Sequence, residues 1–520
     1  MKKTSAYTIK IALIVALGGF LMGFDASVIS GVIKFIEPHF NLTKLQLGWA
    51  VSCLTLTATL AMMVAGPLSD KLSRRTVLRI AAILYFISAV ASALAPSYAF
   101  LVIARMIGGL GVGASLIIAP MYIAEISPPE KRGRLVSFNQ LNIVIGISVA
   151  FFTNYLILQL GYSEASWAKA LRFADYNWRW MLGLETLPAI IYFFSLFAVP
   201  RSPRWLMMKQ HYDEALAVLK KVVGTLAETG FENIKASIQA DTKKEKTPVR
   251  ELFKPAMKLV LTIGIVIAVL QQITGINSVF FYAPMIFEQS GIGTDASFSQ
   301  AILVGLTNLV FTIVAIWLID KIGRKALLVI GLTGIALSMF LLAAGFNSAT
   351  YQLTSSSIEQ LPEAVQSEQL YTITDQTFES DIQFKRALNE MLEPEELKEH
   401  ESDLIARAIQ INPLLILIGI IGFVASFAVS IGPVMWVLFS ELFPNRLRGL
   451  AISFAGFINS AVSFTVQLVF PLELATLGTS LTFLLYGVFG ALGLVFVLIV
   501  VPETKGRSLE ELEKILVKSE

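Results

Sequence analysis

Long apolar segments, separated by short polar ones, make up most of this 520-residue chain. Twelve of them are long enough to cross a hydrocarbon core about 30 Å thick as helices. They cover residues 11–32, 47–68, 77–96, 99–124, 137–160, 180–200, 258–288, 299–319, 327–346, 412–438, 450–471 and 479–501. We therefore predict an all-α membrane protein with twelve transmembrane helices in a lipid bilayer. The first apolar run lacks a convincing cleavage site, so we interpret it as an uncleaved span.

Composition agrees with this pattern and excludes several other classes. The chain is 55% hydrophobic, with a mean hydropathy of +0.69, and only 15% of its residues are charged; soluble domains have about 25%. The net charge of +3 is small, so we expect no nucleic-acid partner. A single cysteine, Cys53, rules out an internal disulfide and a cysteine-based metal site. The three histidines are scattered along the chain, so we expect no metal and no cofactor.

Lysines and arginines gather in alternate loops, which predicts the orientation. The rich segments include 74–79, 131–134, 201–257 and 321–325. By the positive-inside rule these segments are cytoplasmic, and an even number of spans places both termini there as well. The sides of the molecule are named below from this prediction.

Two charged motifs occur twice in the chain. Asp70-Lys71 with Arg74-Arg75 is repeated as Asp320-Lys321 with Arg324-Lys325, and Glu125 with Arg132-Gly133 is repeated as Glu441 with Arg448-Gly449. The second spacing is longer by 66 residues, the length of the polar segment 346–411. We therefore predict two six-helix pseudo-repeats, 1–200 and 258–501, as in the major facilitator fold, with the ligand between them.

The remaining segments are assigned from their position and polarity. We predict that 201–257 is a cytoplasmic helical linker and that 502–520 is a cytoplasmic tail with a helix starting at Ser508. The insert 346–411 is interpreted as an extracytoplasmic cap or a mobile loop, whose second part, 381–410, could form helix. We assign no chemistry to it.

Three ionisable residues fall at one depth within the first six spans. Asp25 lies roughly 21 Å from the cytoplasmic edge at 1.5 Å per residue, and Arg105 and Glu185 fall near the same level. Ionisable groups inside a membrane are rare and usually functional. An acid beside an arginine can gain and lose a proton as its surroundings change. The alternative is a static ion pair that holds helices together.

The repeated charged motifs lie at cytoplasmic helix ends. Their sharpest interpretation is a gate of salt bridges between the two halves that closes the cytoplasmic side; the alternative is ordinary anchoring at the interface. The candidate gate residues are Asp70, Arg74, Arg75, Glu125, Arg132, Asp320, Arg324, Glu441 and Arg448.

Amide side chains mark a candidate ligand site in the segment QQITGINSVFFY, residues 271–282. Unpaired amides facing lipid are costly, so they should face protein or water. A break at Thr274-Gly275 would let Gln271, Gln272, Asn277 and Tyr282 converge. Uncharged groups that donate and accept hydrogen bonds suit a sugar better than an ion. Hydrogen bonding between neighbouring helices is an equally good interpretation of this segment alone.

A set of motifs carries a resemblance to a known family. They are RMIGGLGVG at 105–113, PMYIAEISPPEKRG at 120–133, PRSPRW at 200–205, QQITGIN at 271–277, DKIGRK at 320–325, GPVMWVLFSELFP at 432–444 and PETKG at 502–506. The chain resembles the sugar porters of the major facilitator superfamily, over nearly its whole length except 346–411. The resemblance places the sugar contacts on Gln140, Gln271, Gln272, Asn277, Trp436 and Asn459, with Tyr282 and Asn308 close by.

The resemblance also bears on coupling to protons. Proton-coupled members have an acid where Asp25 stands and an arginine where Arg105 stands, whereas facilitators have asparagine at the first position. The chain departs from the family pattern at Leu72-Ser73, Ile147, Arg201, Phe281 and Ser460. Arg201 puts one cytoplasmic salt bridge in doubt, and the changes near the sugar leave pentose against hexose open.

We expect a proton-coupled monosaccharide importer that works by alternating access, monomeric, in the bacterial cytoplasmic membrane. The alternatives are an uncoupled sugar facilitator and a sugar-sensing receptor on a transporter scaffold. An enzyme is not expected, because no nucleophile–base set is found. The sugar itself stays open.

Overall fold

The computed structural model describes residues 6–128, 131–224, 227–242, 248–359, 361, 369–444, 446–505 and 511–512. The predicted start of a tail helix at Ser508 lies outside these residues. The chain divides into two compact units. The N-terminal unit is Met1–Val28, Cys53–Ala150 and Arg179–Thr247; the C-terminal unit is Ile29–Ser52, Phe151–Trp178 and Pro248–Glu520.

Each predicted span corresponds to one helix or to one interrupted helix. The continuous ones are α1 (Ala6–His39), α2 (Lys44–Leu72), α3 (Arg74–Ala93), α4 (Tyr98–Ile126), α5 (Arg132–Gly161), α14 (Thr294–Ile322), α15 (Arg324–Asn347), α21 (Arg448–Thr476) and α22 (Thr479–Val500). The interrupted ones are α7 (Asn177–Gly183) with α8 (Thr186–Ser195), α12 (Lys258–Ile273) with α13 (Ile276–Glu288), and α19 (Pro413–Val429) with α20 (Ile431–Leu442).

Eleven helical stretches among the described residues are long and apolar enough to cross a membrane. The sixth predicted span is not among them, because α7 and α8 are separated at Leu184 and Glu185 and each is short. The break between α12 and α13 falls at Thr274-Gly275, where it was predicted. Gly275 has φ +93°, and a Cβ at this position would collide with the Tyr486 ring.

Glycines allow close packing in the N-terminal unit. A Cβ at Gly109 or Gly113 on α4 would collide with the backbone carbonyls of Leu54 and Ala58 on α2. Small residues at such crossings let membrane helices approach backbone to backbone. The helix α4 also packs along α3, which packs on α8.

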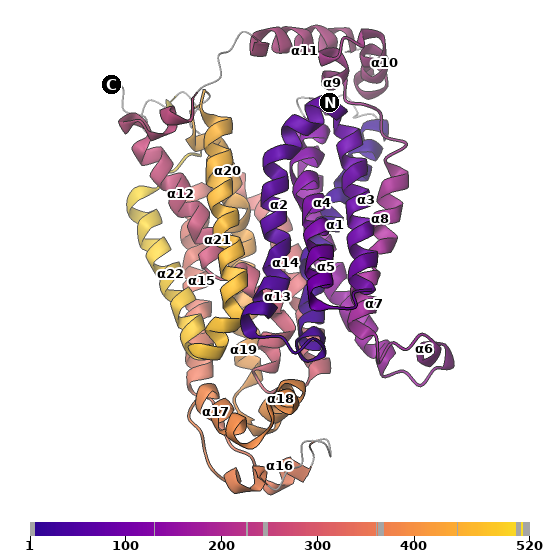
Figure 1. The fold of residues 1–520 in the computed structure, drawn as a ribbon. Helices are drawn as coiled ribbons and strands as arrows, with labels where there is room; N and C mark the ends of the chain where they lie inside the picture. The colour runs from indigo at the N-terminus through magenta and orange to yellow at the C-terminus, as the bar shows by residue number, and fades with distance from the viewer. Residues whose placement is uncertain are drawn as a thin grey trace. The chain divides into compact units, whose positions relative to one another are not determined.

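A helical layer, α9 (Pro203–Met208), α10 (Tyr212–Val223) and α11 (Ala227–Thr242), completes the N-terminal unit. Trp205, Leu206 and Val218 are among the buried residues of its core. Figure 1 shows this layer beyond the ends of α3 and α4, on the side of the N-terminus. These helices lie within the segment 201–257, which was predicted to be a helical linker.

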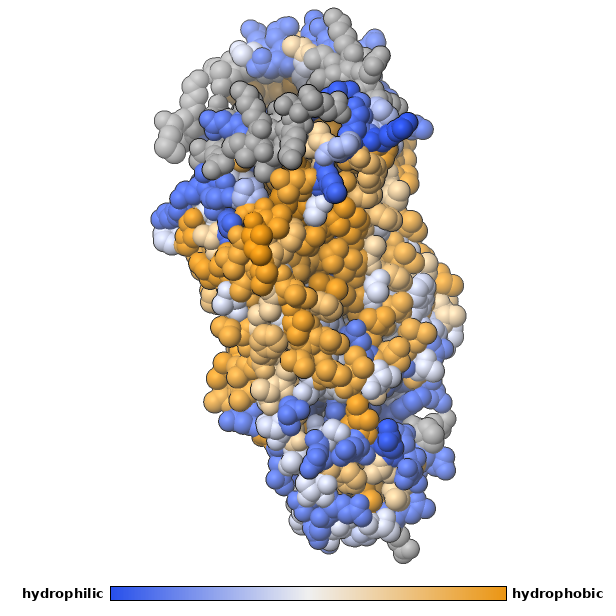
Figure 2. Space-filling model, turned by 90° about the vertical axis from the view of Figure 1, so that its left-hand side faces the viewer, coloured by the Kyte–Doolittle hydropathy of each residue, from blue (hydrophilic) through white to orange (hydrophobic). Residues whose placement is uncertain are grey.

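In the C-terminal unit, α15 packs against α22 and α19, and α12 packs against α21. Two short 3-10 turns, η3 (Val249–Phe253) and η4 (Pro255–Met257), precede α12. On the face drawn in Figure 2, a belt of apolar side chains separates two polar ends, as expected for a protein that spans a bilayer.

The insert folds into a small cap at the end of the C-terminal unit away from η3 and η4 (Figure 1). Its elements are β1 (Thr350–Tyr351), α16 (Ser355–Glu359), η6 (Leu370–Ile373), α17 (Asp381–Met391), α18 (Pro394–Ala408) and β2 (Ile409–Gln410). The two strands pair antiparallel, with Thr350 opposite Gln410, and so hold the two ends of the insert together. Its core includes Leu353, Phe384 and Leu404. Both α17 and α18 lie in the part expected to form helix.

Candidate functional site

The structure brings four predicted sugar-binding amides together in the C-terminal unit. Gln271 and Gln272 end α12, Asn277 begins α13, and Asn459 lies on α21. Gln272 Nε2 donates to Asn459 Oδ1 at 3.1 Å and to Gln271 Oε1 at 3.3 Å. Asn277 Nδ2 donates to Gln272 Oε1 at 2.8 Å, and Asn459 Nδ2 donates to Gln271 Oε1 at 2.7 Å. We call Gln271, Gln272, Asn277 and Asn459 the amide network.

The break at Gly275 makes this arrangement possible. An unbroken helix would place Gln272 and Asn277 roughly 140° apart around its axis. The left-handed Gly275 redirects the chain, so that the first turn of α13 returns Asn277 to Gln272. Gln271, Gln272 and Asn459 are buried, and Asn277 is partly buried.

Two further residues extend the amide network along α21. Ser463 Oγ accepts from Asn277 Nδ2 at 2.6 Å and from Gln467 Nε2 at 2.8 Å. Sequence reasoning missed both residues. Their signal was present, because Asn459, Ser463 and Gln467 are spaced four residues apart on an apolar helix and therefore share one face.

The other predicted sugar residues lie outside the amide network. Tyr282 is fully buried at a kink in α13, and its hydroxyl donates to the Gln467 carbonyl at 2.9 Å. Asn308 is buried on α14. Trp436 on α20 has 48% of its surface exposed, and its ring centroid lies 6.0 Å from that of Phe439. Gln140 is exposed on α5 in the N-terminal unit. Their contact with a sugar stays a prediction.

The three membrane-embedded ionisable residues form a buried cluster in the N-terminal unit. Arg105 Nη1 on α4 lies 3.5 Å from Asp25 Oδ1 on α1, and both side chains are at most 2% exposed. Glu185, between α7 and α8, is also buried and lies within electrostatic range of both charges. Asp25 Oδ2 and Glu185 Oε1 have no hydrogen-bond partner among the described residues. Buried polar atoms normally have a hydrogen-bond partner, so these two oxygens call for a functional explanation.

Gly108 lets Asp25 reach α4. A Cβ at this position would lie 2.9 Å from Asp25 Oδ2 and 2.5 Å from Ser88 Oγ. Because Gly108 has no side chain, the Asp25 carboxyl group can lie against α4, the helix that carries Arg105.

At the cytoplasmic helix ends, each half pairs its own repeated charges. Arg74 lies 2.7 Å from Asp70 and 3.0 Å from Glu125, and Arg324 lies 2.8 Å from Glu441. The other predicted gate arginines donate to backbone carbonyls: Arg75 to Val199, Arg132 to Ala124 and Arg448 to Phe443. The side chain of Asp320 lies outside the described residues. These pairs hold helix ends within one half, and a gate between the halves stays a prediction.

The repeat extends to a third partner that the sequence reading missed. Ser202 donates to Glu125, and Thr504 donates to Glu441 at 2.6 Å. The preceding residue differs between the two halves, however, because Arg201 precedes Ser202 and Glu503 precedes Thr504. Glu503 accepts the N–H groups of Arg324 and Lys325 at 3.1 Å each, whereas Arg201 lies over the Trp205 ring and 3.8 Å from Glu214. Arg201 therefore cannot reproduce in the first half the bonds that Glu503 makes in the second.

Outer ends of N-terminal-half helices belong to the C-terminal unit and pack on its helices. Lys34 on α1 lies 2.6 Å from Glu288 on α13. On α2, the Trp49 ring meets that of Phe464 edge to face, with centroids 5.9 Å apart. Gln159 on α5 donates to Asp295 on α14. The predicted extracytoplasmic ends of α1, α2 and α5 are therefore fixed to the second half.

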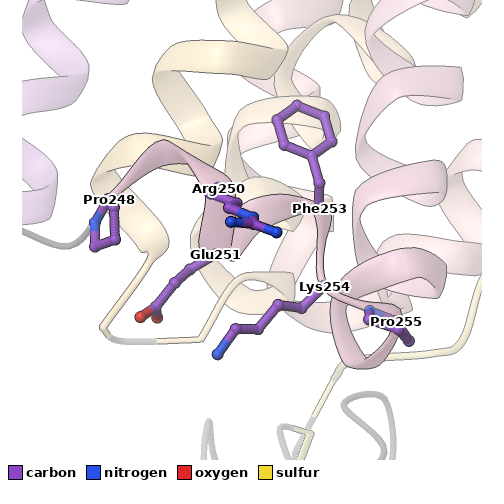
Figure 3. Close-up of a pocket in the computed structure, with 6 residues that line it drawn as sticks. All are labelled: Pro248, Arg250, Glu251, Phe253, Lys254 and Pro255. Atoms are coloured by element: carbon purple, nitrogen blue, oxygen red, sulfur yellow. The ribbon is translucent and has the colours of Figure 1, made fainter.

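One surface hollow lies away from these groups. It is lined by Pro248, Arg250, Glu251, Phe253, Lys254 and Pro255 around η3 and η4. Figure 3 shows that the labelled side chains point in different directions rather than toward a common centre. We assign it no role in binding. Among the described residues, no three His, Cys, Asp or Glu side chains are grouped so as to hold a metal ion.

Comparisons with known proteins agree with this architecture. A family model described as "Sugar (and other) transporter" matches residues 11–360 and 402–516. The chain is 33% identical over 513 residues to the arabinose-proton symporter of Bacillus subtilis, covering 98% of this chain and 96% of that protein. It is 34% identical over 543 aligned positions to the D-xylose-proton symporter of Escherichia coli, with the same coverage. The inward open structure of the xylose transporter XylE from E. coli has a TM-score of 0.74 at 32% identity, covering 98% of this chain and 100% of that one.

Proposed function

Because the chain belongs to the sugar (and other) transporter family, we propose that it imports a monosaccharide together with a proton by alternating access. The substrate is a pentose or hexose, such as D-xylose or D-glucose. The protein works as a monomer in the bacterial cytoplasmic membrane with both termini in the cytoplasm.

The buried cluster is the observation that carries the coupling proposal. An arginine and two carboxyl groups are all removed from water, and one oxygen of each acid has no hydrogen-bond partner among the described residues. Asp25 binds and releases the proton, because its Oδ1 lies beside the guanidinium while its Oδ2 has no partner in the part of the chain that the structure describes. Arg105 tunes the affinity of Asp25 for the proton, and Glu185 supplies a second acid within electrostatic range. A static ion pair between Asp25 and Arg105 would not require Glu185 as a second buried acid beside them.

The amide network supports a neutral, hydroxyl-rich substrate. It offers hydrogen-bonding groups with no net charge, which fits a sugar and disfavours an ion. Gln140, Gln271, Gln272, Asn277, Trp436 and Asn459 bind the sugar, with Tyr282 and Asn308 as neighbours. Trp436 suits this role because an exposed aromatic face packs on the apolar C–H face of a pyranose.

Transport by purified protein in liposomes tests the proposal. We expect uptake of radiolabelled D-xylose, L-arabinose or D-glucose, with alkalinisation of the medium outside that depends on the added sugar. Sugar counterflow without any proton movement would instead support the uncoupled facilitator. Sugar binding without flux would support the sensing receptor, for which the cap of residues 346–411 is the candidate contact surface.

A further inference from the structure

We infer that the amide network recognises the hydroxyl groups of its sugar mainly as hydrogen-bond donors. The inference rests on the proposed function, since it concerns the polarity of the same binding site. It follows from how few N–H groups of the network remain unused.

Two backbone carbonyls fix the orientation of the first two amides. Gln271 Nε2 donates to the Gly432 carbonyl at 3.1 Å, and Asn459 Nδ2 donates to the Ala268 carbonyl at 2.9 Å. A carbonyl can only accept, so rotating either amide by 180° would place oxygen against oxygen. Gln271 Oε1 and Asn459 Oδ1 must therefore face the interior of the network.

The orientation of the other two amides follows from these. Gln272 Nε2 lies near both of those oxygens, so its amino group must point to them and its Oε1 must point away. Asn277 Nδ2 meets that Oε1 and therefore must be the donor. The same amino group also donates to Ser463 Oγ. All four amides are thus oriented by Gly432 and Ala268.

The amide network has more unused hydrogen-bond acceptors than unused donors. Gln272, Asn277 and Asn459 each give two N–H bonds to oxygens, so of these four amides only Gln271 keeps one N–H that is unused among the described residues. Among the oxygens, Gln271 Oε1 accepts twice, and Gln272 Oε1 and Asn459 Oδ1 accept once each. Asn277 Oδ1 accepts none of these bonds, and a carbonyl oxygen can accept two. Ser463 adds one hydroxyl donor.

The excess of unused acceptors remains even if the longest hydrogen bond of the network breaks. If the 3.3 Å contact between Gln272 and Gln271 opens when the sugar binds, it releases one donor and one acceptor together. Asn277 Oδ1 is the principal acceptor, because it belongs to the least buried amide and neither of its lone pairs is used within the network. A ligand that fills these positions must supply several O–H groups, which a monosaccharide does.

Deoxy and deoxyfluoro sugars test this polarity on the unaltered protein. Fluorine replaces a hydroxyl at similar size and can accept weakly, but it cannot donate. We expect competition against radiolabelled D-glucose and D-xylose to weaken roughly tenfold for the fluoro analogue at the positions that face the network. The deoxy analogue at the same positions should weaken equally.

A variant locates the effect. In Asn277→Ala, one fluoro analogue should compete about as well as its parent sugar, so the ratio of their inhibition constants should fall to near one, because the acceptor is gone. Thr465→Val serves as the matched control on α21, since its hydroxyl bonds its own helix at Ala461 and is exposed. It should keep the full ratio.

The inference is overturned if every fluoro analogue competes within threefold of its parent while the deoxy analogues fail. An unchanged ratio in Asn277→Ala would also contradict the assignment of Asn277 Oδ1. If the unmodified sugars themselves are neither bound nor transported, the proposed function is rejected and this inference with it.

Discussion

Glu401 on α18 connects the cap to the end of a membrane helix, and neutralising it should loosen the cap. Its carboxylate lies 2.7 Å from Lys385 on α17 and 3.6 Å from Lys44 at the start of α2. All three side chains are only about one-fifth to one-quarter exposed. The perturbation is Glu401→Gln, which keeps the shape and removes the charge between the two ammonium groups.

The magnitude follows from the pKa of this carboxyl. Burial alone would raise the pKa of Glu401, but the charges of Lys385 and Lys44 outweigh burial and lower the pKa to about 2, from an ordinary value of 4.5. By linkage, that difference corresponds to roughly 3 kcal/mol between the charged and neutral forms. Glutamine resembles the neutral form, so the opening free energy of the cap should fall by about that amount.

Hydrogen exchange of the α17 and α18 amides measures this opening directly. At neutral pH, exchange in Glu401→Gln should be roughly a hundredfold faster than in the unaltered protein. The matched control is Glu396→Gln, an exposed carboxylate on the same helix, which should change little. Exchange rates that stay within threefold of each other in the two variants would refute the role of Glu401.

The pH dependence has a definite sign. Because the pKa of Glu401 is lowered in the folded protein, its stabilisation is complete above pH 4.5 and is lost as the pH falls toward 2. The unaltered cap should therefore open more easily over that range, after correction for intrinsic exchange. Over the same pH range, the difference in opening free energy between the unaltered protein and Glu401→Gln should become smaller.

Two further substitutions test local contacts. Gly108→Ala should displace Asp25, because the new Cβ would lie 2.9 Å from its Oδ2. Proton-driven sugar accumulation should therefore fall, while sugar exchange between the two sides of the membrane persists. An equal loss of accumulation and exchange would contradict this explanation. Glu503→Gln should lower the unfolding free energy by about 1 kcal/mol, since charge-assisted bonds to the N–H groups at the start of α15 are lost. Thermal unfolding in detergent measures it, and an unchanged melting temperature would show that the carboxylate is not needed there.

Hydropathy and residue depth were enough to predict the membrane helices and the proximity of Asp25 to Arg105, because both depend on the bilayer thickness and the helix rise. The break at Thr274-Gly275 was also predicted, since glycine tolerates the left-handed conformation observed there. These features are local in the sequence.

Other features depended on contacts between distant segments. The break at Leu184 and Glu185 directly follows Gly183, but a glycine within an apolar run does not by itself predict a break, and the hydropathy of 180–200 predicts one span. The pairing of Lys34 with Glu288 and of Lys44 with Glu401 joins helices far apart in the chain, so no local pattern indicated it. The fixed orientation of the amides depends on the carbonyls of Gly432 and Ala268, which any residue type could supply.

Steady-state accumulation of labelled sugar in liposomes, driven by an inward proton gradient, tests most directly whether the buried acid of α1 carries the proton. The unaltered protein should raise the internal sugar concentration above the external one. Asp25→Asn should bring the two concentrations to equality while still catalysing counterflow, and Asp403→Asn, an exposed acid of α18, should accumulate normally. Accumulation by Asp25→Asn to the same level as the unaltered protein would contradict the coupling mechanism.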